Sequence, residues 1–162
     1  MIKYIYDLIF SSFYKPIEAF IEKPWEKQLK TFDYLISHGQ RTYFGEKNNF
    51  DKIKTPEDFK KYVPIMGYDD LKLYLDIIIN ERKSNVLWDT PVKWFAMSSG
   101  TTNDKSKYIP VTEESLKNCH YRGGYHMLAL YAKHNPENRY LFGKSLVMGG
   151  SQQVNTIGEG IF

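Results

Sequence analysis

The hydrophobic residues at the N-terminus predict an amphipathic helix that ends at Pro16. One side of this helix carries apolar residues at helical spacing, namely Ile2, Ile5, Leu8 or Ile9, and Phe13. A signal peptide or a membrane span is not indicated. Asp7 interrupts the apolar run, no small-residue cleavage site follows it, and a span needs about 20 apolar residues. We therefore expect a helix that is buried or lies at an interface.

A second helix is predicted from Pro24 to His38. Proline fits the first turn of a helix because its missing N–H would have no partner there. Gly39 is expected to end this helix in the left-handed conformation, and residues 39–53, rich in glycine, asparagine and charge, are predicted to form a loop. Apolar residues recur every three or four positions and form one stripe along the helix, at Trp25, Leu29, Phe32 and Ile36.

Two shorter helices are predicted between residues 55 and 83. In the first, Thr55 is placed to cap the helix, Pro56 takes the first helical position, and Asp58 stands at the capping-box distance. This helix is expected to end before Pro64. The second begins near Asp69, ends between residues 80 and 83, and directs apolar side chains inward at Leu71, Leu75 and Ile78 or Ile79. Residues 1–85 are therefore predicted to be helical.

The hydrophobic period changes after residue 85. The run VKWFAM at residues 92–97 predicts a short buried strand, and KYIPVT at residues 107–112 predicts a second extended segment. Thr112 is expected to cap a long helix. Gly123 and Gly124 in the middle of that helix indicate close packing or a bend.

A further buried strand is predicted near residues 144–148, where KSLVMGGS leads into glycines. The order of strand, glycine-containing loop, helix and strand is typical of α/β folds. We therefore expect an incomplete sheet with short strands near 92–97 and 144–148. No repeat or linker divides the chain, so residues 1–162 are predicted to belong to one domain, helical over 1–85 and α/β over 86–162.

The composition is that of a folded domain, since 42% of the residues are hydrophobic and 16% are aromatic. The net charge is +3, and basic and acidic residues are mixed along the chain, so no polybasic face indicates a nucleic-acid partner. Cys119 has no second cysteine to pair with, and no N-glycosylation sequon occurs, which favours a cytoplasmic protein. Neither a nucleic acid nor a membrane is predicted as a partner.

The candidate chemistry lies in the loop that follows the first predicted strand. Consecutive backbone N–H groups can form an anion site, hydroxyls add uncharged donors, and glycine lets a ligand approach the backbone. Lys105 and Lys107 supply positive charge, so we expect a phosphate-binding loop. The same residue types also form ordinary polar turns, and composition alone leaves this alternative open. The small and hydroxyl-bearing residues of the loop are Ser98, Ser99, Gly100, Thr101 and Thr102.

A metal site or a cysteine nucleophile is a weaker hypothesis. Cys119 and His126 are seven residues apart on one predicted helix face, and His120 and His134 lie on the same helix. Catalytic or structural zinc needs three or four protein ligands, and the sequence places no base beside the cysteine. Packing and surface roles are therefore expected, and no metal ligand is predicted.

The loop and its surroundings resemble a known family. SSGTTNDKSKYIPVT is similar to the phosphate-binding motif of the adenylate-forming superfamily, specifically that of the auxin-responsive promoter (Gretchen Hagen) family of acyl-acid amido synthetases. The motifs TYFG, IKTPEDFKKYVPIMGYDDLKLYL, NVLW and LFGKSLVMGGS occur in an order that resembles the amino-terminal region of bacterial members. The resemblance covers nearly the whole chain and implies the helix-rich amino-terminal part of the large adenylate-forming domain.

This resemblance implies an ATP-dependent ligase that uses Mg²⁺. In such an enzyme a carboxylic acid attacks the α-phosphate of ATP to give an acyl-adenylate and pyrophosphate, and an amine such as that of an amino acid then takes the acyl group. By that likeness residues 98–102 and Lys107 hold the β- and γ-phosphates, with Lys107 as the catalytic cation. Lys105 is ranked below it among the residues that bind the nucleotide.

Two departures from the family pattern bear on this interpretation. Asp104 stands where members commonly have glycine, and an acidic side chain beside a polyphosphate is unfavourable unless it turns away or meets the metal. Family enzymes are also several times longer. The chain is therefore expected to be an amino-terminal piece that is inactive alone and whose unpaired strand edges favour self-association. The alternative function is a non-catalytic helical interaction module, or a truncated remnant that kept the fold and lost the chemistry.

Overall fold

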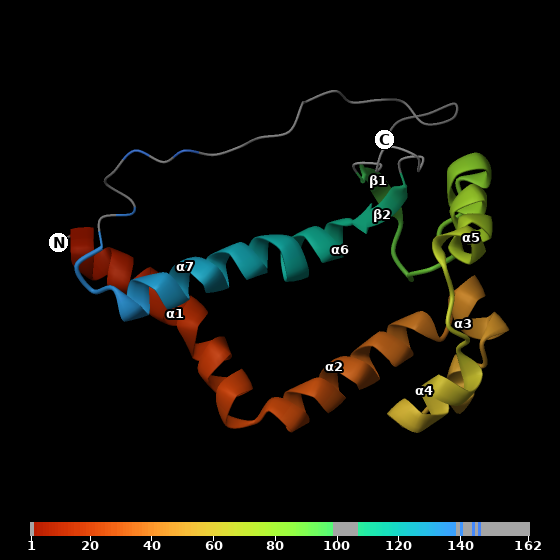
Figure 1. The fold of residues 1–162 in the computed structure, drawn as a ribbon, viewed down its shortest axis with the longest axis horizontal. Coiled ribbons are helices and arrows are strands. Elements are labelled where there is room, and N and C mark those ends of the chain that lie inside the picture. The colour runs from red at the N-terminus through yellow and green to blue at the C-terminus, as the bar shows by residue number, and fades with distance from the viewer. Residues whose placement is uncertain (1, 99–106, 139, 141–143, 145, 147–162) are drawn as a thin grey trace. The chain divides into compact units, whose positions relative to one another are not determined.

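The computed structural model of the chain describes residues 2–98, 107–138, 140, 144 and 146, with side chains from Leu8 onward (Figure 1). Contacts divide these residues into two compact units. One contains the residues up to Trp25 together with the segment that begins at Glu114, and the other contains Glu26–Glu113. Helices dominate both units, and both described strands lie in the second.

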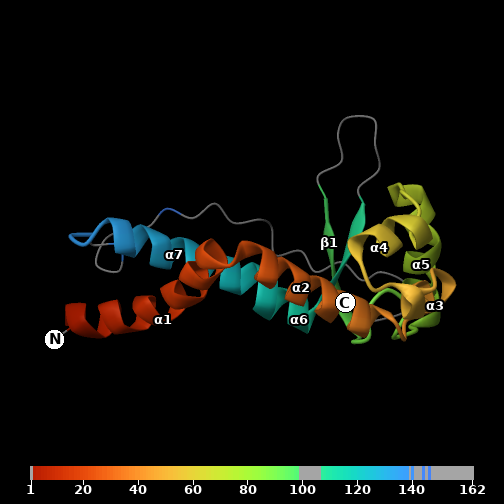
Figure 2. The ribbon, with the colours of Figure 1, turned by 90° about the horizontal axis from the view of Figure 1, so that it is seen from below.

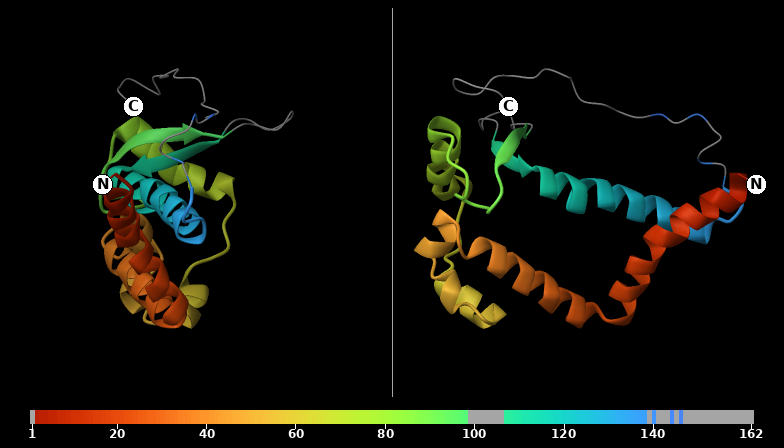
Figure 3. Two further views of the ribbon diagram at one scale, coloured as in Figure 1. Left: turned by 90° about the vertical axis from the view of Figure 1, so that its left-hand side faces the viewer. Right: turned by 180° about the vertical axis from the view of Figure 1, so that it is seen from behind.

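The first unit pairs α1 (Ile2–Glu22) with α7 (Arg122–His134), which pack against each other (Figure 3). The ring of Phe13 stacks on that of Tyr125, with centroids 4.8 Å apart. The ammonium of Lys133 lies 5.0 Å from the centre of the Tyr14 ring. Two helices that are far apart in the sequence therefore stabilise each other through aromatic contacts.

The prediction that the first helix ends at Pro16 is wrong, because α1 continues through this proline to Glu22. Proline removes one backbone hydrogen bond and crowds the preceding turn, which a long helix can absorb as a kink. Figure 1 shows that the axis of α1 changes direction along its length.

The long helix predicted after Thr112 forms in three parts. A short α6 (Glu113–Ser115) leads into a π-helical segment, η2 (Leu116–Tyr121), and then into α7. The two glycines of α7 do not mark close packing, since a Cβ built on either would meet no atom within 4 Å among the described residues. The departure from regular α-helix is the π-helical segment just before them.

The second predicted helix is confirmed as α2 (Pro24–Gly39), but the role of its last residue differs from the prediction. Gly39 is helical and buried, and a Cβ on it would lie 2.8 Å from Cε2 of Phe50. Close packing, and not the left-handed conformation, therefore explains this glycine.

The loop predicted after α2 instead contains two short helices, α3 (Tyr43–Lys47) and the 3₁₀ turn η1 (Phe50–Lys52). The cap of α3 is Thr42, a fully buried residue whose Oγ1 accepts the N–H of Gly45 at 3.0 Å. A helix of five residues is too short to show a hydrophobic period, and for this reason the pattern did not reveal it.

The two shorter predicted helices are confirmed as α4 (Pro56–Tyr62) and α5 (Tyr68–Glu81). The capping box of α4 forms as expected, since Thr55 Oγ1 accepts the N–H of Asp58 at 3.1 Å and the Asp58 carboxylate accepts the N–H of Thr55 at 3.0 Å. The backbone N–H of Lys54 also donates to this carboxylate, and it is the main cause of the lowered pKa of Asp58, followed by the Thr55 hydroxyl.

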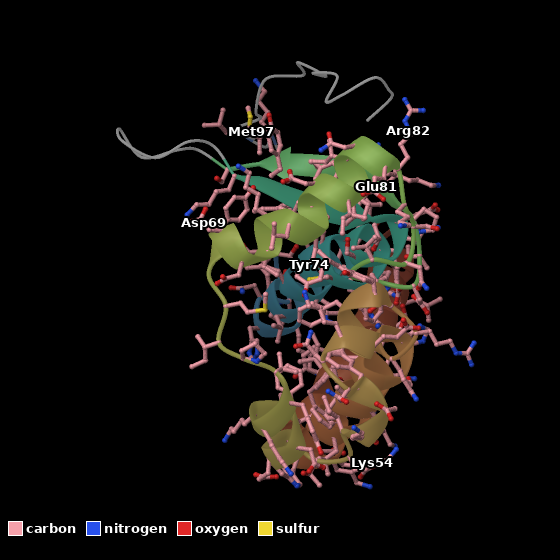
Figure 4. The ribbon with its side chains drawn as sticks, turned by 90° about the vertical axis from the view of Figure 1, so that its right-hand side faces the viewer. Lys54, Asp69, Tyr74, Glu81, Arg82 and Met97 are labelled. Atoms are coloured by element: carbon pink, nitrogen blue, oxygen red, sulfur yellow. The ribbon has the colours of Figure 1, made fainter. Side chains whose placement is uncertain are left out.

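The core of the second unit is formed by α5 and the segment that precedes the first strand. The N–H groups of Tyr43 and Phe44 donate to the carbonyls of Asn85 and Val86, which fixes the start of α3 to that segment. Figure 4 shows Tyr74 on the side of α5 that faces the short helices, where its ring centroid lies 5.3 Å from that of Phe44. The buried members of the core are Tyr74, Ile78 and Val86, with Phe44, Met66, Ile77, Leu87, Val92 and Phe95 packed against them.

The strands β1 (Val92–Met97) and β2 (Tyr108–Thr112) form an antiparallel hairpin (Figure 2). The strand predicted at 92–97 is confirmed, but the prediction that it is buried is wrong, since Trp94 is 41% and Met97 57% exposed. In the described fold β1 has one strand beside it, and Phe95 turns toward the α5 core while neighbouring side chains remain outside it.

Of the strand predicted near 144–148, the structure describes only Lys144 and Leu146, and neither belongs to a strand. The other residues of that range lie outside the described part of the chain. The described fold is mostly helical with a two-stranded antiparallel sheet, in agreement with the predicted helix-rich character.

Candidate functional site

The loop with the candidate chemistry leaves the hairpin between Ser98 and Lys107, which are paired through two hydrogen bonds. The backbone N–H of Ser98 donates to the carbonyl of Lys107 at 3.0 Å. The backbone N–H of Lys107 donates in return to Oγ of Ser98, also at 3.0 Å. A serine hydroxyl that accepts a hydrogen bond still has its own hydrogen to donate. The pair therefore closes the base of the loop and leaves Ser98 able to bind an acceptor such as a phosphate oxygen.

Tyr68, the first residue of α5, contacts this base from a second element. Its hydroxyl accepts the backbone N–H of Tyr108 at 2.8 Å and donates to the Tyr108 carbonyl at 3.4 Å. The Nζ atom of Lys107 lies 5.6 Å from the centre of the Tyr68 ring, within the range of a cation–π interaction. Lys107 and both tyrosines are half-buried. The ends of both strands and the start of α5, which is 40 residues from its partner in β2, thus meet at the base of the loop.

Of the predicted site residues, the structure describes Ser98 and Lys107 and brings them together. The remaining ones lie outside the described residues, as does Asp104, and their roles stay predictions. These are Ser99, Gly100, Thr101, Thr102 and Lys105.

Sequence reasoning missed Tyr68, which lies 40 residues from its hydrogen-bond partner in the chain. The stretch IMGYDDL that contains it belongs to one of the motifs that carry the family resemblance and marks the start of a helix, but neither observation assigns a role to the tyrosine. An aromatic residue at the first turn of a helix gives no indication of which distant strand its hydroxyl contacts.

A second polar cluster, also missed, joins the end of α2 to the segment before β1. His38 Nδ1 and Asp89 Oδ2 are 2.6 Å apart. The imidazole stacks on the indole of Trp88, with ring centroids 5.5 Å apart, and its centroid lies 4.2 Å from that of Tyr34. Aromatic rings on both neighbouring segments restrict the imidazole, so the cluster serves as a connection between two parts of the second unit.

A surface hollow of about 440 Å³ lies in the same unit, around the end of α5. Charged groups of both signs line it, and Lys83 Nζ pairs with Glu81 Oε2 at 3.3 Å. Neither Ser98 nor Lys107 belongs to its lining, so it is separate from the candidate loop. Its polar lining includes Arg41, Glu46, Glu81, Lys83, Ser84 and Asn85.

Within the described ranges, no group of three or more histidine, cysteine, aspartate or glutamate side chains is placed to hold a metal ion. Cys119 is exposed on the π-helical segment. Among the helices that the structure describes, none has both the length and the apolar character needed to cross a bilayer.

Comparison with known proteins identifies relatives over part of their length. The chain is 31% identical over 110 residues to the 4-substituted benzoates-glutamate ligase GH3.12 of Arabidopsis thaliana, a match that covers 60% of this chain and 19% of the ligase. It is 39% identical over 61 residues to the indole-3-acetic acid-amido synthetase GH3.15 of the same plant, covering 38% of this chain and 10% of the synthetase. These matches span a fifth or less of each relative's length.

The fold agrees with these matches. A solved structure of the GH3.15 acyl acid amido synthetase superposes with a TM-score of 0.59 and 28% sequence identity, over 67% of this chain and 20% of the other. The family model described as the GH3 family N-terminal domain matches residues 13–161. Since this model covers most of the sequence, the chain belongs to the GH3 family.

Proposed function

We propose that this chain is the amino-terminal portion of an ATP-dependent acyl-acid amido synthetase, which joins a carboxylic acid to an amine such as that of an amino acid. The observation that carries the proposal is the match to the GH3 N-terminal domain over residues 13–161, together with relatives that are named as amido synthetases and ligases. The resemblance of the motifs to bacterial members and a cytoplasmic location are parts of the same proposal.

The proposed reaction has two steps. A carboxylate oxygen of the acid attacks the α-phosphorus of ATP, and the bond from that phosphorus to the bridging oxygen breaks, so pyrophosphate leaves. The amine nitrogen then attacks the carbonyl carbon of the acyl-adenylate, AMP leaves with the bonding electrons, and the nitrogen loses a proton to give the amide. Both steps become easier when donors and cations stabilise the charge on the departing phosphate group.

The described residues at the base of the loop suit a phosphate ligand. Ser98 offers a hydroxyl hydrogen, and Lys107 offers an ammonium group on the same end of the hairpin. We assign phosphate binding to them, with Lys107 as the catalytic cation, and extend the assignment to the loop residues Ser99, Gly100, Thr101, Thr102 and Lys105. Mg²⁺ would be held chiefly through the phosphates and would neutralise part of the charge of the departing pyrophosphate.

The 162-residue chain by itself is proposed to lack amide-forming activity. Its matched segments cover a fifth or less of the relatives' length, and the groups that bind adenine, ribose and much of the acyl substrate are assigned to the remainder of such an enzyme. Full activity is therefore a property to test in the complete protein.

The test is ATP–pyrophosphate exchange by the complete protein with a panel of aromatic and aliphatic carboxylic acids, followed by capture of the activated acid as a hydroxamate. We expect exchange that depends on both the acid and Mg²⁺. If no acid in the panel supports exchange or hydroxamate formation, the proposal is refuted, and a non-catalytic interaction module becomes the better interpretation.

A further inference from the structure

The start of α5 is fixed beside the end of the hairpin from which the candidate loop departs. Figure 4 shows the beginning of α5, marked by Asp69, on the same side as the end of β1, marked by Met97. The helix start is itself capped, because the N–H of Gly67 donates to the carboxylate of Asp70 at 2.8 Å. Tyr68 therefore projects from a well-defined first turn toward β2.

At Tyr108 in β2, the Tyr68 hydroxyl makes the two backbone hydrogen bonds that a neighbouring strand would otherwise make. Residue pairs along an antiparallel ladder alternate between those that exchange hydrogen bonds and those that do not. The N–H of Ser98 donates to the carbonyl of Lys107 as at a bonded position, while the N–H of Lys107 donates to the Ser98 hydroxyl. The next residue, Tyr108, pairs with Met97 and directs its backbone groups to the Tyr68 hydroxyl, away from β1. The hydroxyl satisfies both of these groups, which fixes the backbone immediately after Lys107.

The ring of the same tyrosine contacts the side chain of Lys107, whose ammonium lies over it. With Nζ 5.6 Å from the ring centre, the ammonium lies near the electron-rich face of the ring. A lysine side chain has many rotamers, and a contact that selects one direction reduces the entropy lost when a ligand is bound. Tyr68 thus acts on Lys107 at two points, through the backbone that follows it and through the ammonium at its tip.

From these contacts we propose that Tyr68 is a positioning residue that sets the place and direction of the Lys107 ammonium for the phosphates of ATP. The inference rests on the proposed function of the loop and goes beyond it by assigning a residue of another element to the site. Tyr68 acts through Lys107 and is not assigned a contact with the nucleotide.

The decisive variant is Tyr68→Phe in the complete protein, because it removes both hydroxyl bonds and keeps the ring under Lys107. We expect the KM for ATP in pyrophosphate exchange to rise about fivefold, as for one good hydrogen bond, because the second bond is long at 3.4 Å; the KM for the acid should be unchanged. Amide hydrogen exchange at Tyr108 is expected to become faster, and this readout requires no activity. Tyr68→Leu, which removes the ring as well, should raise the KM for ATP further.

The matched control is Tyr62, whose ring also carries a lysine, with Lys61 Nζ 5.2 Å from its centre, but which lies at the end of α4. Tyr62→Phe and Tyr62→Leu should leave the KM for ATP unchanged. Melting temperatures of all four variants separate a general loss of stability from an effect on the site.

Each outcome decides the inference. If the wild-type protein exchanges pyrophosphate and Tyr68→Phe has the same KM for ATP, or raises both KM values equally, the positioning role is overturned while the proposed function stands. If the wild-type protein shows no exchange with any acid, the proposed function fails and this inference fails with it. A selective rise in the KM for ATP, with faster exchange at Tyr108 and unchanged Tyr62 variants, supports the inference.

Discussion

Replacing Gly45, the glycine of the TYFG motif, with alanine tests whether tertiary packing requires this glycine or whether its helix merely tolerates it. Gly45 lies in the middle of α3, where helix propensity alone would make alanine more stable by about 1 kcal/mol. The structure predicts the opposite, namely that alanine at this position lowers the free energy of unfolding. A Cβ built on Gly45 would lie 1.9 Å from the backbone oxygen of Gly39 and 2.8 Å from its carbonyl carbon.

The clash cannot be relieved by moving a flexible side chain, because the opposing atoms belong to the backbone. The Gly39 carbonyl already accepts hydrogen bonds from the N–H of Thr42 at 3.1 Å and from its Oγ1 at 2.7 Å. Reaching an ordinary contact distance requires α2 and α3 to separate by more than about 1 Å. Overpacking of this kind costs about 1–3 kcal/mol, and each hydrogen bond broken adds about 1 kcal/mol. We expect Gly45→Ala to lower the free energy of unfolding by about 3–5 kcal/mol, a large part of the stability of a small domain.

The assay is urea unfolding of the chain, followed by far-ultraviolet circular dichroism and by tryptophan fluorescence. The matched control is Gly124→Ala, the same change in a helix where the new Cβ would meet no atom within 4 Å. This control should gain about 0.4–1 kcal/mol of stability. If Gly45→Ala is as stable as the wild type, or if the two variants shift in the same direction, the packing argument for Gly45 is refuted.

The loop lysines, the capping box of α4 and the histidine pair provide further tests. In the complete protein, Lys107→Ala should lower the rate of adenylation more than Lys105→Ala, by at least about tenfold, because Lys107 keeps its spacing from the serine pair and its ammonium lies over the Tyr68 ring; equal losses would contradict this ranking. The lowered pKa of Asp58 means that its carboxylate stabilises the fold above about pH 4 and that this contribution disappears as the pH falls through the folded-state pKa. Urea unfolding should therefore show Asp58→Asn less stable than the wild type at pH 7, with the difference closing in acid, and a constant difference would exclude the linkage. His38→Ala removes the hydrogen bond to Asp89 and the stacked ring, so the unfolding midpoint should fall by an amount equivalent to about 1–2 kcal/mol, and an unchanged midpoint would argue against a connecting role.

The elements predicted correctly from the sequence are those whose signals are local. The capping box at Thr55 and Asp58 and the strand at 92–97 each depend on residues a few positions apart. The end of the first helix was predicted wrongly because Pro16 is a local signal, and α1 continues through it. Gly39 was assigned the wrong role for a related reason, since its contact with Phe50 involves a residue whose position only the folded chain reveals.

The phosphate-binding role of the candidate site stays a prediction. Small residues followed by lysines indicated an anion-binding loop, and the structure places two of its residues, Ser98 and Lys107, together at the base of the hairpin. Sequence reasoning could not supply the support for that base. Tyr68 is 40 residues from the strand it contacts, and His38 is 51 residues from Asp89, so no spacing rule connects either pair. Contacts of this kind depend on the topology of the whole unit.

The helix α5 connects the core of the second unit to the base of the loop. Substitutions at the two ends of this connection are expected to have different effects on stability and on the loop base. The buried face of the helix, with Tyr74 and Ile78, packs in the core, while Tyr68 at its start holds β2. A substitution that shifts α5 from the core side should therefore disturb both stability and the base of the loop. Tyr68→Phe removes only the hydroxyl contact with β2, so it should alter the base of the loop and leave most of the free energy of unfolding unchanged. A variant that alters the base of the loop without a loss of stability identifies a residue that positions the site. A variant that disturbs both identifies a residue that maintains the fold. Proximity to the loop does not distinguish these two roles.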